Sequence, residues 1–291
     1  MHLGNVFSAL LAWLSVRSQG GEMVLRIEDL DPDRCRPEYA QTLREDLHWL
    51  GLDWDREQTP QSRRSDAYAA RFAQLQNLVY PCYCTRDQLH AASAPHALDG
   101  RVIYAGTCRH LTGAQRAAMT KKPAWRLMVP DQVYGFADGL QGYFSENLAR
   151  DCGDFIIRRA DGVYAYQLAV TADDGAMGIT RVVRGWDLLS STPRQIWLLE
   201  QLGYPIPTYC HLPLLVSPDG RRLSKRDRDL DIGVLRQKST PEAVTGFLAH
   251  TAGLLPKPEA VHPRDLIPLF SWDKVGTQDR IVDSEALLTR R

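Results

Sequence analysis

The chain of 291 residues lacks a net charge, since 35 lysines and arginines balance 35 aspartates and glutamates. A neutral molecule has no overall attraction for nucleic acid, so any contact with RNA must come from local basic patches such as residues 221–228. The chain also lacks internal repeats and low-complexity tracts. Its 44% hydrophobic and 24% charged residues are typical of a globular protein with a real core.

Long hydrophobic runs are scarce. Residues 6–16 form an apolar run that resembles the core of a signal peptide. However, no basic residue precedes it, no convincing small-residue cleavage site follows it, and it is too short to span a bilayer. We therefore expect a buried helix at this position and a cytoplasmic protein.

Cysteine is also scarce. The distribution of the cysteines indicates a reducing compartment and a metal site rather than a disulfide framework. Three cysteines are scattered, namely Cys35, Cys152 and Cys210, and three are clustered, namely Cys82, Cys84 and Cys108. Three thiolates and one further ligand would satisfy tetrahedral zinc. The spacing alone leaves the fourth ligand open among His90, His96, Tyr104 and His110, and it also allows three buried structural thiols.

The order of predicted elements favours an α/β fold. Residues 23–27 read as a strand, and Asp31-Pro32-Asp33 introduces a helix that Gly51 ends. Another helix is predicted from Ser65, followed by a strand at residues 79–83. This alternation predicts a doubly wound parallel sheet of the Rossmann type.

Periodicity weakens between residues 81 and 150, which predicts an insert within the sheet domain. We assign residues 1–80 and 151–205 to the two halves of a catalytic domain. Residues 81–150 form the predicted zinc-binding insert, and residues 206–291 contain a basic loop and C-terminal helices.

Two motifs far apart in the sequence favour nucleotide binding. His2-Leu3-Gly4-Asn5 precedes the first predicted helix, where an imidazole and backbone N–H groups can meet phosphate oxygens. The second motif is a basic loop, Arg222, Leu223, Ser224, Lys225 and Arg226, which could bring Lys225 to a polyphosphate. Each motif has a plainer reading as a chance match or a solvated loop.

Several segments together resemble the glutamyl-Q tRNA(Asp) synthetase family, a shortened relative of glutamyl-tRNA synthetase. They are residues 1–5, 25–31, 82–84, 104–108, 183–188 and 222–225. The resemblance implies a class I synthetase catalytic domain with a Rossmann-type sheet, a zinc-containing insert and no anticodon-binding domain. It covers nearly the whole chain.

The resemblance also implies roles for individual residues. His2, Gly4 and Lys225 would bind ATP with Mg²⁺, and Glu28, Tyr166 and Arg184 would bind glutamate. The zinc ligands would be Cys82, Cys84, Tyr104 and Cys108. Taken without the family, Glu28 reads as a helix cap, Tyr166 as core, Arg184 as a structural arginine and Asp173-Asp174 as a turn.

The implied reaction is activation of L-glutamate by ATP, followed by transfer to queuosine in the anticodon of tRNA(Asp). We expect a monomer without membrane contact. The alternatives are a compact enzyme that charges the 3′ end of tRNA(Glu), a different nucleotidyltransferase, or an inactive tRNA-binding remnant.

One departure from the family bears on folding. Its members begin about a dozen residues earlier, with an Arg-Phe-Ala-Pro-Ser-Pro-Thr-Gly-like strand and turn that supply the first, central strand of the sheet. We therefore expect this strand to be missing from residues 1–291 and the true start to lie upstream of Met1. Without the strand, we expect poor folding and weak or absent glutamate activation.

Overall fold

The computed structural model describes residues 1–33, 35–85, 103–221, 223 and 231–282. Helix α1 (Leu3–Arg17) begins after His2, whose Nδ1 accepts a hydrogen bond from the backbone N–H of Gly4 at 3.1 Å. Phe7, Leu10 and Leu14 are among its fully buried side chains. The prediction of a buried helix in this region is therefore confirmed.

The next elements form a short parallel pair of strands. Strand β1 (Val24–Leu25) pairs with β2 (Arg56–Glu57), and helix α2 (Pro37–Trp49) lies between them in the sequence. Gly51 follows α2 with a φ of +74°, a conformation that glycine adopts without steric cost, so it ends the helix as predicted.

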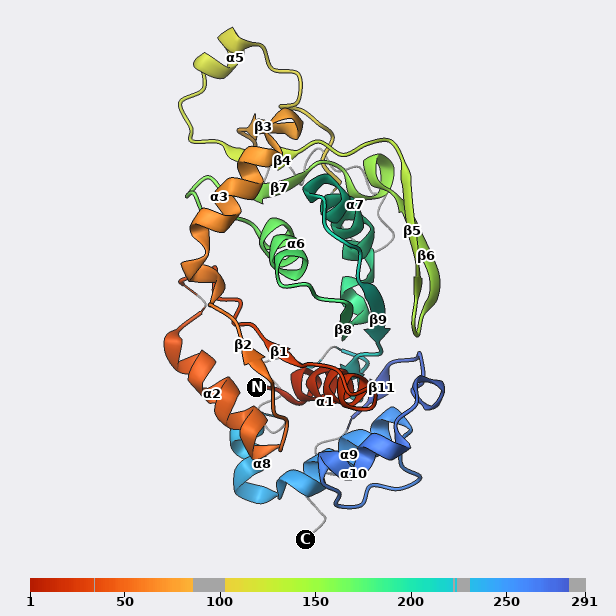
Figure 1. Cartoon of the computed structure of the whole chain (residues 1–291). Coiled ribbons are helices and arrows are strands. Elements are labelled where there is room, and N and C mark those ends of the chain that lie inside the picture. The colour runs from red at the N-terminus through yellow and green to blue at the C-terminus, as the bar shows by residue number, and fades with distance from the viewer. Residues whose placement is uncertain (34, 86–102, 222, 224–230, 283–291) are drawn as a thin grey trace.

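Helix α3 (Ser65–Gln74) then leads into a three-stranded antiparallel sheet with the order β3-β4-β7. These strands are β3 (Val79–Cys82), β4 (Ala124–Leu127) and β7 (Phe155–Arg158). The short helix α5 (Gly113–Ala117) lies between β3 and β4 in the sequence, beyond the sheet in Figure 1. This sheet supports the cysteine cluster.

A four-stranded sheet with the order β6-β5-β9-β8 contains two parallel pairings, β5 with β9 and β8 with β9. Its strands are β5 (Val133–Asp138), β6 (Gly142–Asn147), β8 (Arg181–Gly185) and β9 (Thr208–Leu212). The β5–β6 hairpin lies within the predicted insert by sequence, yet β5 joins β9 at Asp138↔Tyr209.

Helices α6 (Tyr166–Ala176) and α7 (Thr192–Leu202) flank β8 in the sequence. The expectation of a turn at Asp173-Asp174 is wrong, because both residues lie in α6. The Asp173 carboxylate is fully buried and accepts hydrogen bonds from Gln61, Arg64 and Tyr68. These bonds replace the solvation that a turn would have provided.

The C-terminal part packs against α1 and completes the first hydrophobic core. It contains helices α8 (Ile232–Lys238), α9 (Pro241–Ala252) and α10 (Pro263–Leu266), and the parallel strands β10 (Leu215–Val216) and β11 (Arg280–Ile281). A second core lies around α3, α6 and α7. None of the described helices is long and apolar enough to cross a membrane.

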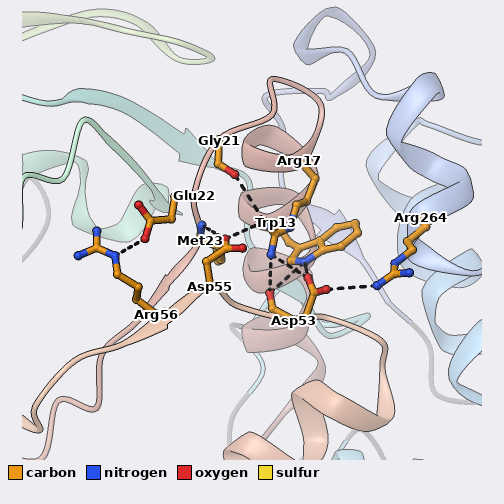
Figure 2. Close-up of polar contacts among 9 residues, drawn as sticks. All are labelled: Trp13, Arg17, Gly21, Glu22, Met23, Asp53, Asp55, Arg56 and Arg264. Atoms are coloured by element: carbon orange, nitrogen blue, oxygen red, sulfur yellow. Dashed lines mark hydrogen bonds and ion pairs between the residues drawn. The ribbon is translucent and has the colours of Figure 1, made fainter.

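The end of α1 is attached to the loop that joins α2 and β2. As Figure 2 shows, the Asp53 carboxylate accepts hydrogen bonds from Trp13 Nε1 at 2.9 Å and Arg17 Nη2 at 2.8 Å. Asp55 accepts from Arg17 Nη1 and from the backbone N–H of Met23, both at 2.7 Å. Arg264 reaches Asp53 from the C-terminal region at 3.3 Å. These bonds fix α1 relative to the start of β1.

The parallel pairs β1–β2 and β8–β9 belong to separate sheets in the described structure. Figure 1 shows β1 with β2 on one side and β8 with β9 on the other, with α6 above and α1 below the space between them. The α/β content is as predicted, but the described strands form four sheets rather than one parallel sheet, and the predicted strand at residues 79–83 pairs antiparallel as β3. Strands β1 and β8 each have only one neighbouring strand among the described residues.

Candidate active site

A cavity of about 900 Å³ occupies the space between strands β1 and β8. Ala12, Ser15 and Val16 of α1 line one wall, and Tyr166, Val170 and Asp174 of α6 line another. Strand β1 and its flanks contribute residues 23–26 and Glu28, and β8 with the residues before it contributes residues 179–184. The cavity is thus bounded by two strand edges and two helices, and it is open to solvent.

Glu28, Tyr166 and Arg184 all line this cavity, although up to 156 positions separate them in the sequence. Tyr166 is 39% exposed, so it is not a core residue. Glu28 does not cap α2, since the N-cap position is Arg36. The alternative interpretations of Glu28 as a helix cap and of Tyr166 as a core residue are therefore wrong.

The Glu28 side of the cavity carries an excess of negative charge. Arg26 lies two positions earlier, and its guanidinium contacts Glu28 at 2.7 Å and Asp174 at 2.6 Å. One cation is therefore shared by two carboxylates. Burial raises the pKa of Asp174, although the neighbouring Arg26 opposes that shift.

On the opposite side of the cavity, the guanidinium of Arg184 forms hydrogen bonds with neutral groups. Arg184 Nη2 donates to Thr192 Oγ1 and to Gln195 Oε1, both at 2.8 Å, and Nε donates to His211 Nε2 at 3.1 Å. Among the described residues no carboxylate lies within ion-pair distance of Arg184. The reading of Arg184 as a salt-bridged structural residue therefore does not match its surroundings.

The first nucleotide motif contacts the segment that follows the predicted basic loop. His2 forms an isolated antiparallel bridge with Asp231, and the backbone N–H of Ile232 donates to the carbonyl of Met1 at 2.8 Å. Within the loop, Leu223 is 3% exposed and belongs to the same core as α1. Arg222, Ser224, Lys225 and Arg226 lie outside the described residues.

The three clustered cysteines converge around the hydroxyl of Tyr104. Its oxygen lies 3.5 Å from Cys82 Sγ and 3.7 Å from Cys84 Sγ, and it accepts a hydrogen bond from the Cys108 backbone N–H at 2.8 Å. The sulfurs of Cys84 and Cys108 are 3.6 Å apart. Ligands about 2.3 Å from a tetrahedral zinc ion would be separated by roughly 3.8 Å, so the spacing fits such an ion.

A nearby arginine favours the ionised form of the ligands in the cluster. Arg126 donates to Cys82 Sγ at 3.3 Å, and its guanidinium carbon lies 3.7 Å from the centre of the Tyr104 ring. Burial raises the pKa of the Cys84 thiol to about 11, so a cation is needed to hold a thiolate there at neutral pH. His110 is exposed and outside the cluster, while His90 and His96 lie outside the described residues.

Sequence reasoning missed Arg26 and Asp174, which line the cavity, and the buried pair Asp138 and His211, of which His211 contacts Arg184. A signal existed for Arg26, because residues i and i+2 of an extended segment project to the same side. No spacing connects Asp138 with His211, which are 73 positions apart.

Comparison with known proteins identifies the class. Residues 1–259 match the family described as class I tRNA synthetases (E and Q), catalytic domain. The glutamate tRNA ligase structure from Elizabethkingia meningosepticum, in complex with its amino acid, superposes with a TM-score of 0.82 at 26% identity. The match covers 99% of this chain and 65% of that one. The fold and site thus define a class I aminoacyl-tRNA synthetase-like ligase.

Curated relatives narrow the assignment. A glutamyl-Q tRNA(Asp) synthetase from Nitratidesulfovibrio vulgaris is 46% identical over 304 residues, covering 99% of this chain and 93% of the relative. One from Symbiobacterium thermophilum is 45% identical over 305 residues, covering 99% and 94%. The chain belongs to the glutamyl-Q tRNA(Asp) synthetase family, as its sequence motifs predict.

Proposed function

We propose that this enzyme activates L-glutamate with ATP and Mg²⁺ and transfers the glutamyl group to queuosine in the anticodon of tRNA(Asp). The observation that carries the proposal is the distribution of charge in the cavity. Arg184 offers a cation without a carboxylate partner among the described residues, and Glu28 with Asp174 outnumber Arg26. Glutamate has two carboxylates and one ammonium, so it complements these walls.

In the first step, an oxygen of the glutamate α-carboxylate attacks the α-phosphorus of ATP. The bond from that phosphorus to the bridging oxygen breaks, which yields glutamyl-adenylate and pyrophosphate. Arg184 binds a glutamate carboxylate, Glu28 binds the ammonium, and Tyr166 lines the cavity beside them. Catalysis then rests on orientation and on stabilising phosphate charge.

The ATP phosphates are assigned to His2, Gly4 and Lys225. Support comes from the contact between His2 and Asp231, because it brings one flank of the basic loop to the N-terminus of α1. Phosphate groups bind well at such a helix terminus, where backbone N–H groups and the helix dipole favour negative charge. Lys225 would neutralise charge on the departing pyrophosphate.

We propose further that Cys82, Cys84, Tyr104 and Cys108 hold one structural zinc ion. The sulfur and oxygen spacing supports this set, and Arg126 offsets part of its negative charge. The six cysteines, all within the described residues, form no disulfide, which fits a reducing compartment such as the cytoplasm.

We propose that an extended segment fills the slot between β1 and β8, as expected for the strand upstream of Met1. Both strands are parallel to their other neighbours, and α1 and α6 line the slot. A parallel strand inserted there would join the two pairs into one sheet and satisfy backbone groups on both edges. Without it, the remnant alternative applies to residues 1–291.

Transfer assays test the proposed acceptor. With [¹⁴C]glutamate and ATP, tRNA(Asp) that contains queuosine should become labelled, and the same tRNA without queuosine should not. Removing the 3′-terminal adenosine should leave labelling unchanged. If labelling of tRNA(Glu) instead requires its terminal adenosine, the compact glutamyl-tRNA synthetase is the correct reading, and the likeness to a glutamate tRNA ligase would explain it.

A further inference from the structure

Arg184 is hydrogen-bonded to a buried histidine, which is hydrogen-bonded in turn to a buried carboxylate. His211 on β9 is fully buried, and Asp138 at the end of β5 has a fully buried side chain. Asp138 Oδ2 lies 2.6 Å from His211 Nδ1, and Arg184 Nε lies 3.1 Å from His211 Nε2. We refer to these three residues as the Asp138–His211–Arg184 relay.

The partners of the His211 ring fix its tautomer. An ionised carboxylate only accepts hydrogen bonds, and a guanidinium only donates them. His211 must therefore carry its proton on Nδ1, where it donates to Asp138, and must leave Nε2 free of a proton to accept from Arg184. Thr192 Oγ1, 3.2 Å from Nε2, is a hydroxyl and can donate to it in this tautomer. A proton on Nε2 would oppose the Arg184 N–H group and repel its charge.

Asp138 is itself held in place as an acceptor. Its Oδ1 accepts from the backbone N–H groups of Leu140 and Gln141 at 2.9 Å and of His211 at 3.1 Å. Burial works to raise the pKa of Asp138, but the hydrogen bond from His211 and these backbone N–H groups keep it below its ordinary value. The carboxylate thus stays ionised and keeps His211 in one tautomer.

The relay leaves part of the Arg184 guanidinium available to the cavity. Nε is bound by His211, and Nη2 is bound by Thr192 and Gln195. Nη1 has no acceptor among the described residues, and Arg184 lines the cavity. Three hydrogen bonds to neutral acceptors fix the plane of the guanidinium without cancelling its charge.

We propose that Asp138 and His211 are positioning residues for substrate glutamate, which they influence by orienting Arg184 toward a glutamate carboxylate. This inference rests on the proposed function, because it takes Arg184 as the glutamate ligand. Neither residue touches the substrate. They fix the orientation of the Arg184 guanidinium, so their loss should weaken glutamate binding and leave ATP binding unchanged.

The first test is the tautomer, which needs no activity. Long-range ¹H–¹⁵N NMR spectra of ¹⁵N-histidine-labelled protein at pH 7 should show His211 protonated on Nδ1 and unprotonated on Nε2. The signal is identified by its loss in His211→Gln. The protein used is residues 1–291 or a chain extended upstream by the family's first strand, whichever is active in glutamate-dependent pyrophosphate exchange, and residues 1–291 if neither is active. An Nε2–H tautomer or an imidazolium would overturn the relay.

The second test is kinetic and uses Asp138→Asn, which keeps the size of the side chain but lets His211 change tautomer. In glutamate-dependent pyrophosphate exchange, the KM for glutamate should rise roughly 10- to 100-fold, because a misdirected ligand binds poorly. The KM for ATP should change less than about twofold. Asp131→Asn is the matched control, since within the described part of the chain Asp131 bonds only Asn147, near the other end of β5.

A double variant separates positioning from a general structural effect. In an Arg184→Lys background, adding Asp138→Asn should raise the KM for glutamate less than about twofold further, because the residue through which it acts is already changed. Additive effects, or an unchanged KM for glutamate in folded Asp138→Asn, would overturn the proposal. Absence of exchange both in residues 1–291 and in a chain extended upstream would contradict the proposed function, while the NMR result would still decide the relay.

Discussion

Arg184 is the residue on which glutamate recognition depends most in this account. Its guanidinium donates hydrogen bonds to Thr192, Gln195 and His211, none of which is a carboxylate. Arg184→Lys keeps the charge but loses the planar fork that these acceptors hold. We expect the KM for glutamate to rise at least about 10-fold with little change in the KM for ATP, as measured by pyrophosphate exchange.

Arg181→Lys is the control for that variant. Arg181 lines the same cavity and donates to Ser15 Oγ at 3.3 Å, but it has no role in the proposed glutamate pocket. Its KM for glutamate should stay within about twofold of the wild type. Equal effects of the two substitutions would mean that the cavity senses only total charge.

His211 also predicts how stability depends on pH. Burial lowers the pKa of His211 below its ordinary value of 6.5. Below about pH 6.5 the unfolded chain therefore binds a proton that the folded chain does not, and the free energy of unfolding falls as the pH falls. This one group can contribute up to about 1.4 kcal/mol per pH unit.

Urea unfolding at pH 7.5 and pH 5.5 measures that dependence. The wild type should lose more stability between the two pH values than His211→Gln, which can accept from Arg184 but does not titrate. Equal losses in the two proteins would show that His211 is protonated in the folded state or exposed to solvent.

At the scale of single residues, the sequence reveals chemistry when the partners are close or follow a known pattern. Cys82 and Cys84 could be grouped with Cys108 from spacing, and the structure brings their sulfurs together. Asp138 and His211 could not be grouped, because their contact arises from the packing of β5 on β9. Asp173 reads as polar turn material until its buried partners are known.

Among the elements, α1 depends on its attachment to the loop before β2. Asp53→Ala removes hydrogen bonds from Trp13 and Arg17 and an ion pair with Arg264. We expect a loss of about 1 kcal/mol in the free energy of unfolding, measured by urea denaturation, because these side-chain bonds are lost while the indole N–H keeps the Asp53 carbonyl at 3.1 Å.

The matched control is Glu22→Ala, which removes the exposed ion pair with Arg56 shown in Figure 2. Exposed ion pairs contribute little, so this change should stay within about 0.5 kcal/mol of the wild type. A similar loss in both variants would mean that the Asp53 network adds nothing beyond surface charge.

The cysteine cluster beside the β3-β4-β7 sheet predicts that the protein contains zinc. Elemental analysis of protein purified without chelator should find about one zinc ion per chain, and Cys108→Ser should lower that content strongly. Cys210→Ala, a buried cysteine of β9 outside the cluster, should keep it. Zinc-free wild-type protein would remove the ligand assignment of Tyr104 along with the cysteines.

At the scale of elements, local patterns predicted helices better than strands. The buried helix α1, the end of α2 at Gly51 and the start of α3 at Ser65 agree with the structure. The β5–β6 hairpin was not expected, because its pairing with β9 is set by a partner about 70 residues away. Strand pairing depends on distant partners, whereas a helix is satisfied within itself.

For the whole molecule, the slot between β1 and β8 is the feature that links fold to activity. It separates two parallel pairs that a single inserted strand would join, and Glu28 and Arg184 line it. We expect a chain extended upstream by the family's first strand to be more stable to urea than residues 1–291. Equal stability and equal activity of the two forms would mean that nothing is inserted there.

The most direct test is glutamate-dependent exchange of pyrophosphate into ATP, without tRNA, on residues 1–291 and on the extended chain. The account predicts exchange in the extended chain and weak or absent exchange in the shorter one, with both signals dependent on glutamate. Silence from both forms, or exchange with another amino acid alone, would contradict the proposal that this cavity activates glutamate.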